Sequence, residues 1–296
     1  MNKFMKVLAA SALVATALTG CGSKAKFAKA GLGVVTSMGH YNPAEVNTTF
    51  AGIALDSDGK IQWIDVDVAQ GVPGDSKQEF TKTKKEKKDE YNMRNASSIK
   101  KEWFEQIAAF EQQCIGKTPD EVAKFAVDGE GKPTDADVKA GCSMAITDFQ
   151  KAVANAAANA QEVNAEKVTL GRVMSYESDT YQAPWTYLTT DLALVSTDAD
   201  GKIVGVDLET SKNKNDGSNL ETKTALKEKY DMKKASPIQK EWFEQVAYLE
   251  SKLIGKTVDE AAKLALGADG KPTDADIKTG CTIVLTQFEA ALAKAK

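Results

Sequence analysis

The chain has 296 residues, of which 42% are hydrophobic and 27% charged, and its formal net charge is −4 at pH 7. This composition argues against intrinsic disorder, and the length allows two domains. Only Arg94 and Arg172 are arginines, and the lysine run at residues 82–90 contains acidic but no aromatic residues, so we expect a solvated helix start there and no nucleic-acid binding.

The N-terminus has the pattern of an export signal. Two lysines precede an apolar run that ends at Leu18, and Thr-Gly-Cys21 follows as in a bacterial lipobox. We expect residues 1–20 to be removed as a lipoprotein signal peptide. Cys21 would then carry acyl chains that anchor the protein to the extracellular face of the cell membrane, with residues 21–26 as a short tether. The alternative is a plain secretory signal with a chance cysteine.

An internal repeat organises the remainder of the chain. Residues 90–143 align with residues 229–282 without an insertion, at a constant spacing of 139 residues. A repeat of this kind predicts that one structural unit occurs twice. We therefore expect an α+β fold built as a tandem repeat of two similar domains, residues 27–163 and 164–296, each a small antiparallel sheet followed by helices.

Each half should open with β-strands joined by a tight turn. The segments 48–69 and 189–209 place strand-like residues on both sides of Asp58-Gly59 and Asp200-Gly201. Asp-Gly favours a hairpin turn, and alternating apolar and polar residues beside it indicate one buried and one solvated strand face. A calcium loop is the less favoured interpretation, because the glycine falls at the wrong position for one.

The second part of each half should be helical. Ser97 and Ser236 are the expected helix N-caps. Behind them, apolar residues recur at i, i+4, i+7 and i+11, which predicts one buried stripe on each helix. The stripe residues are Trp103, Ile107, Phe110 and Cys114 in the first half, and Trp242, Val246, Leu249 and Leu253 in the second.

The sequence Ile-Gly-Lys-Thr occurs at residues 115–118 and 254–257 and suggests a phosphate loop, but the upstream glycine of such a loop is missing. A helix end followed by a new helix start explains it better. Gly116 suits a left-handed helix end, and Thr118 with Glu121 forms the capping box of the next helix.

Histidine and cysteine usage narrows the possible chemistry. His40 is the only histidine, and an odd number of cysteines follows Cys21, namely Cys114, Cys142 and Cys281. Haem attachment, histidine-based zinc sites and Ser-His or Cys-His nucleophilic pairs are therefore unsupported, and we expect free thiols and no metal site. Any redox chemistry would need an organic cofactor.

One short stretch near the end of each half is the strongest candidate site. Both copies contain an aspartate, a glycine, a cysteine and a hydroxyl residue: Asp137, Gly141, Cys142 and Ser143; Asp276, Gly280, Cys281 and Thr282. We expect both hydroxyls at or just before a helix N-terminus, where amide groups and the helix dipole favour a phosphate. The glycine would admit a ligand, and the cysteine would pack beneath it. In the alternative interpretation, both hydroxyls are only N-caps.

This stretch resembles the flavinylation motif of the FMN-binding domain family, Asp-x-x-(Ser/Thr)-Gly-Ala-(Ser/Thr), whose last hydroxyl carries FMN through a phosphoester bond. The second copy departs from the motif only at Cys281, whereas the first also has Ala140 in place of the hydroxyl residue and Cys142 in place of Ala. The resemblance implies covalent FMN on Thr282, the stronger candidate, and on Ser143, the weaker one.

The same resemblance implies roles for further residues. Asp137 and Asp276 would belong to the motif that a flavin transferase recognises. An aromatic and apolar wall would contact the flavin, and its candidates occur in both halves: Tyr91 and Tyr230, Met93 and Met232, and Trp103 and Trp242. For the two tryptophans, a place in the core is at least as well supported by their position in the apolar stripe.

A duplicated motif behind a lipobox is similar to the flavinylated lipoproteins of Gram-positive extracellular electron transfer. The implied function is that of a membrane-anchored extracellular flavoprotein, an electron carrier rather than an enzyme that transforms a substrate. It would take electrons from a membrane quinol-oxidising partner and pass them to extracellular acceptors. The alternative is a non-catalytic surface lipoprotein that binds a ligand or a partner without flavin.

Overall fold

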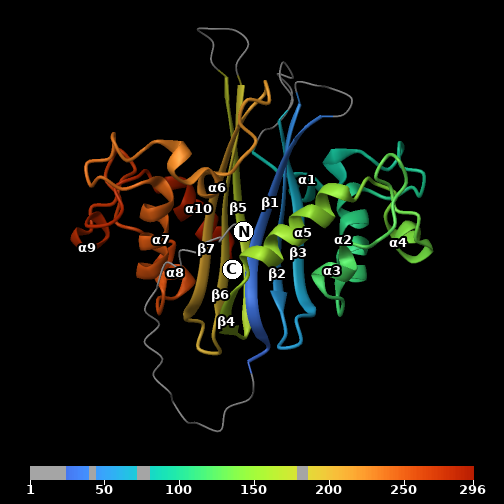
Figure 1. Ribbon diagram of the computed structural model, residues 1–296, viewed down its shortest axis with the longest axis horizontal. Coiled ribbons are helices and arrows are strands. Elements are labelled where there is room, and N and C mark those ends of the chain that lie inside the picture. Colours follow the sequence, from blue (N-terminus) through green and yellow to red (C-terminus); the bar gives the residue numbers. More distant parts are fainter. Residues whose placement is uncertain (1–24, 40–44, 72–80, 179–185) are drawn as a thin grey trace, which may run out of the picture.

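The computed structural model describes residues 25–39, 45–71, 81–178 and 186–296. The expected signal peptide, Cys21 and His40 lie outside the described residues. The fold is mixed α+β, with two antiparallel sheets at the centre and helices on the outer side of each sheet (Figure 1). In the ranges that the structure covers, every helix is too short or too polar to cross a bilayer.

The first sheet has the strand order β3-β2-β1-β4 and the second has the order β5-β6-β7. The strands are β1 (Phe27–Met38), β2 (Val46–Leu55), β3 (Ile61–Gly71), β4 (Gln161–Ala165), β5 (Lys167–Ser178), β6 (Thr186–Thr197) and β7 (Ile203–Lys214). Gly59 and Gly201 adopt φ angles of 76° and 73° in the β2-β3 and β6-β7 turns, so the hairpin prediction is confirmed. The expected domain boundary at residues 163 and 164 falls inside β4, which pairs with β1.

Helices follow the strands in each half. After β3 come α1 (Lys84–Lys87), η1 (Lys88–Tyr91), α2 (Trp103–Cys114), α3 (Pro119–Val122), α4 (Ala136–Gly141) and α5 (Thr147–Asn159). After β7 come α6 (Lys223–Leu226), η2 (Lys227–Tyr230), α7 (Trp242–Leu253), α8 (Val258–Ala261), α9 (Ala275–Lys278) and α10 (Thr286–Lys294). All eight predicted stripe residues of α2 and α7 are buried, as expected.

The core has three layers of apolar side chains. One cluster fills the space between the two sheets and includes Phe27, Phe50, Leu170, Leu188 and Leu192. The other two clusters lie between each sheet and its own helices. The elements therefore stack as helices, sheet, sheet, helices, and the two sheets bury their inner faces against each other.

The helix-start predictions have a mixed outcome. The capping boxes Thr118 with Glu121 and Thr257 with Glu260 are confirmed. The N-cap prediction for the two serines is wrong, because α2 and α7 begin after glutamates that form their own capping boxes. Ser97 lies buried upstream of α2, where its hydroxyl accepts a hydrogen bond from Gln106 Nε2 at 3.0 Å.

Near one edge of the contact between the two sheets, acidic side chains form ion pairs with basic side chains. Arg172 of β5 reaches β3 of the other sheet, where its guanidinium pairs with Asp65 and, at 2.7 Å, with the buried Asp67. Lys85 pairs with Asp65 at 2.7 Å and with Glu111 at 2.6 Å. Burial acts to raise the pKa of Asp65, but the charges of Arg172 and Lys85 outweigh it and hold that pKa below its ordinary value. For Asp67, burial prevails and the pKa is raised.

We expect Arg172→Met to lower the free energy of unfolding at pH 7 by about 3–5 kcal/mol, because two carboxylates would remain without their guanidinium partner. The loss should shrink as the pH falls and these carboxyls become protonated, since a neutral carboxyl needs no counter-charge. Urea unfolding at several pH values measures it. Lys294→Met is the control, because its pair with Glu86 at 3.0 Å is partly exposed and should contribute about 0–1 kcal/mol. Equal losses in the two variants would contradict the assignment.

Candidate functional site

The two motif hydroxyls lie in loops rather than at helix starts. Ser143 follows α4, and α5 begins only after Ile146, its N-cap. Thr282 precedes α10 in the same way, because the N-cap of α10 is Leu285. The N-cap interpretation is therefore wrong for both hydroxyls. The helix dipole is equally weak support for a phosphate there, because its effect is confined to the first turn.

A buried glutamine holds each of these loops. The Ser143 amide and hydroxyl both donate to Gln106 Oε1, at 2.9 and 3.1 Å. The Thr282 amide and hydroxyl donate in the same way to Gln245 Oε1, at 2.8 and 3.2 Å. Both glutamines are fully buried, and each Nε2 donates to a serine hydroxyl and to a backbone carbonyl. Each glutamine thus ties the loop to the segment that enters its helix.

Sequence reasoning missed the two glutamines, although a signal was present. Both halves contain the sequence Trp-Phe-Glu-Gln, in which the glutamine stands three residues after Trp103 or Trp242. That spacing puts an amide on the buried face of an apolar helix stripe. A buried amide requires hydrogen-bond partners, so a glutamine on this face indicates a segment that it must hold.

The candidates for the flavin wall are divided between the core and the neighbourhood of the glutamine. Met93 lies beside Gln106, with 4.0 Å between Sδ and Nε2, and it is therefore connected to Ser143. Tyr91 packs edge-on against Trp103 at a ring-centroid distance of 6.5 Å, and Trp103 in turn contacts Phe149. In the second half, Trp242 belongs to the helix-side core, and the partly buried Tyr230 and Met232 pack against it, as Tyr91 and Met93 do in the first half. Both tryptophans are buried, in agreement with their apolar stripes.

The glycine and cysteine of each motif serve packing. A Cβ atom on Gly141 would lie 2.6 Å from Ala109 Cβ, and one on Gly280 would lie 2.2 Å from Tyr248 Cγ. The missing side chain of each glycine thus allows close contact with helix α2 or α7, and the space is not left open for a ligand. Both motif cysteines are buried and unpaired, and burial raises the pKa of each thiol to about 11. Neither thiol is therefore a nucleophile near neutral pH.

The surroundings of the motif aspartate differ between the halves. The Asp276 carboxylate pairs with Lys252 at 2.9 Å. The Tyr248 hydroxyl bonds to the Asp276 backbone oxygen at 3.1 Å and to the Thr279 hydroxyl at 2.7 Å. At the matching positions around Asp137, the first half has Ala109, Gln113 and Ala140, which provide neither the ammonium nor the two hydroxyl groups. The second copy therefore holds its aspartate in place more firmly.

Comparisons with known proteins identify no relative. No family model, no curated protein and no solved structure matches the chain. Among the residues that the structure describes, no three or more histidine, cysteine or acidic side chains gather as a metal-binding group. The function must therefore be argued from the motif and its surroundings.

We expect Gln106→Leu to lower the free energy of unfolding by about 1–3 kcal/mol, because the Ser143 amide and the Ser97 hydroxyl would lose a buried partner. Hydrogen exchange at the Ser143 amide should become faster. Urea unfolding and exchange followed by mass spectrometry measure the two effects. Gln112→Leu, on the exposed side of the same helix, is the control and should change stability by less than about 0.5 kcal/mol. Unchanged exchange at Ser143 would disprove the clamping role.

Proposed function

We propose that the chain is a tandem repeat of two flavin-carrying domains, with FMN joined to Thr282 and to Ser143, and that it carries electrons between a membrane quinol-oxidising donor and extracellular acceptors. The observation that carries the proposal is the duplicated motif, whose hydroxyl is held in each half by an equivalent buried glutamine, Gln106 or Gln245. Two hydroxyls held alike over a spacing of 139 residues suggest one role performed twice.

Accessibility supports the proposal, because a transferase must reach the attachment residue and its motif. Thr282 and Ser143 are half-buried, and Asp137 and Asp276 are exposed. The loops are at the same time fixed by their backbone bonds to Gln106 and Gln245. An exposed recognition residue beside a positioned hydroxyl is a suitable arrangement for modification by another protein.

The side chains around Thr282 fit a flavin phosphate and its apolar ring. The charge of Lys240 acts on the neighbouring Cys281 thiol, where it opposes the effect of burial on the pKa. The Lys240 carbonyl accepts a hydrogen bond at 3.1 Å from Gln245, the residue that holds Thr282, so its ammonium is our candidate partner for the phosphate charge. Val284 is 55% exposed, which provides apolar surface close to Thr282. Bound FMN would supply the redox chemistry, which no titratable group of this loop provides.

Attachment requires a specific change at the hydroxyl. The Thr282 oxygen would attack the phosphorus of the FMN part of a flavin dinucleotide, the phosphoanhydride bond would break, the nucleoside monophosphate would leave, and the hydroxyl proton would pass to a base or solvent. The Thr282 hydroxyl would then lose its 3.2 Å hydrogen bond to Gln245 Oε1. The backbone N–H of Thr282 would keep its 2.8 Å hydrogen bond to the same oxygen, and this bond would hold the loop in place. A glutamine that holds both groups thus tolerates loss of one.

The test is the intact mass of the exported protein, co-expressed with a flavin transferase, together with its visible absorbance after denaturation. We expect two FMN increments in the unmodified sequence and one in Thr282→Ala, because the Oγ1 atom that forms the bond is removed. Thr286→Ala, an exposed threonine four residues later, is the matched control and should keep both increments. A colourless protein without any increment would refute the flavin function, and two increments in Thr282→Ala would refute the attachment residue.

A further inference from the structure

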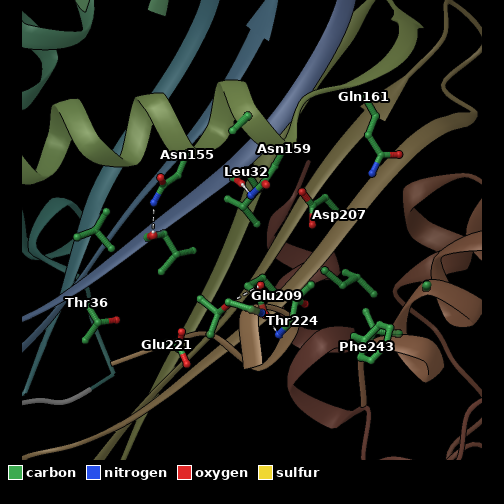
Figure 2. A pocket seen from close by; sticks show the side chains of 18 of the residues that line it. Leu32, Thr36, Asn155, Asn159, Gln161, Asp207, Glu209, Glu221, Thr224 and Phe243 are labelled. Atoms are coloured by element: carbon green, nitrogen blue, oxygen red, sulfur yellow. Dashed lines mark hydrogen bonds between the residues drawn. The ribbon is translucent and has the colours of Figure 1, made fainter. Parts of the chain in front are cut away.

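A cavity of about 890 Å³ lies between the two halves of the molecule, on the side away from Arg172. Residues of β1 and α5 form one wall, and residues of β7, α6 and α7 form the other. Four carboxyl side chains line it. Three of them, Asp207 and Glu209 of β7 and Glu250 of α7, are the carboxyl cluster considered below, and the fourth, Glu221, pairs with Lys229 at 3.9 Å. Figure 2 shows Asp207 and Glu209 on one strand, across from Asn155 and Asn159 of α5.

The described residues place no lysine or arginine in an ion pair with any of the three carboxyls. Glu250 accepts a hydrogen bond from the Leu208 amide at 2.7 Å, and Glu209 accepts one from the Thr222 hydroxyl at 2.7 Å. Asp207 is half-buried, and its hydrogen-bond partner is the backbone of Leu32. Lys151 at the cavity rim has a side chain that is 60% exposed and pairs with Asp148.

Burial is the main influence on the pKa values of the three carboxyls, and the charge of Asp207 adds to it for Glu209 and Glu250. Burial raises the pKa of Asp207 to about 6 and that of Glu209 to about 7. The pKa of Glu250 is raised well above its ordinary value, first by burial and then by the charge of Asp207. With neutral donors alone, the raised pKa values keep part of this cluster protonated near neutral pH, and a bound cation would favour the charged carboxylates.

The other side of the molecule contains the same carboxyl arrangement with its cations in place. Asp65 and Asp67 stand six and eight residues after Gly59, as Asp207 and Glu209 stand six and eight residues after Gly201, and Glu111 precedes Glu250 by 139 residues. Glu111 accepts a hydrogen bond from the Val66 amide at 2.7 Å, as Glu250 accepts one from the Leu208 amide. There, Arg172 and Lys85 pair with all three carboxyls.

Strand register and spacing identify what replaces these cations beside the cavity. Phe50 and Leu192 are equivalent, because each stands nine residues before its turn glycine, Gly59 or Gly201. Val34 pairs with Phe50 in the first sheet, as Arg172 pairs with Leu192 in the second, so Val34 is the counterpart of Arg172. Thr224 stands two residues after the N-cap of α6, as Lys85 stands two residues after the N-cap of α1. The cluster has thus kept its carboxyls while both cations are replaced by neutral side chains. The space beside Arg172 is also smaller, at about 500 Å³.

We propose that this cavity binds a small organic cation, with a guanidinium or ammonium group at Asp207, Glu209 and Glu250 and an alkyl body against the apolar wall. The ligand head would take the place that Arg172 and Lys85 fill on the other side. Val34, Phe243 and Val246 supply the apolar contacts. The volume lies in the range of small-molecule sites, about 300–1,000 Å³. A metal ion is a poorer fit, because among the described residues these carboxyls do not gather as a group of three metal ligands.

Titration calorimetry of the full chain with n-butylguanidinium tests the proposal, with n-butylurea as the neutral ligand of nearly the same shape. We expect saturable binding of one n-butylguanidinium per chain, and no saturable binding of n-butylurea at the same ionic strength. Because this proposal does not depend on flavin, the experiment is run on protein made with and without the transferase. Absence of saturable n-butylguanidinium binding would overturn it and would leave the proposed flavin function untouched.

Variants locate the binding. Asp207→Asn should weaken n-butylguanidinium binding by about tenfold or more, because a charge-assisted hydrogen bond is lost. Glu130→Gln, which makes the same change of net charge at a side chain 69% exposed, should leave the affinity unchanged. Val34→Arg should abolish binding and raise the melting temperature, because the new guanidinium would occupy the site from within. Unchanged affinity in both Asp207→Asn and Val34→Arg would show that the cation binds elsewhere and would overturn the proposal.

Discussion

The face-to-face contact of the two sheets is the constraint on which the other features depend. Each sheet gives its inner face to the other, so its helices can cover only the outer face. Polar side chains at the edge of the contact then lie away from bulk water. Asp67 is buried there and needs a counter-charge, which Arg172 supplies from the opposite sheet. The sheet contact thus determines both where the helices lie and where charges must be paired.

The two edges of this contact meet the same demand differently. On one edge, the carboxyls of β3 and α2 are paired with cations from the chain itself. On the other edge, Val34 and Thr224 stand where those cations would be, and a cavity takes up the space. Loss of a cation from a buried pair is ordinarily destabilising by several kcal/mol. Beside the cavity, neutral donors are the partners of the three carboxyls, and the proposed cation from outside would supply the charge that Arg172 and Lys85 supply on the first edge.

Local patterns in the sequence predicted the local structure well. Asp-Gly turns, apolar stripes and Thr-x-x-Glu boxes involve residues within about one or two helical turns, and the structure confirms each of them. Most failures involve distant partners. Ser143 and Gln106 are 37 residues apart, and Arg172 and Asp67 are 105 residues apart. No periodicity records such pairs, so the sequence does not reveal the glutamine contacts, the sheet contact or its charge pairs. The serine N-cap prediction failed for a local reason, because glutamate capping boxes start α2 and α7.

The same architecture bears on how two flavins would work. Helices α4 and α9, which lead into the two motif loops, stand at opposite ends of the longest axis of the molecule (Figure 1). The paired sheets occupy the space between them. Under the proposed function, each flavin would therefore exchange electrons with donors and acceptors at its own end of the molecule. The arrangement does not favour electron transfer from one flavin to the other. The firmer surroundings of Asp276, with Lys252 and Tyr248, would then give the two ends different rates of flavin attachment rather than successive places in one relay.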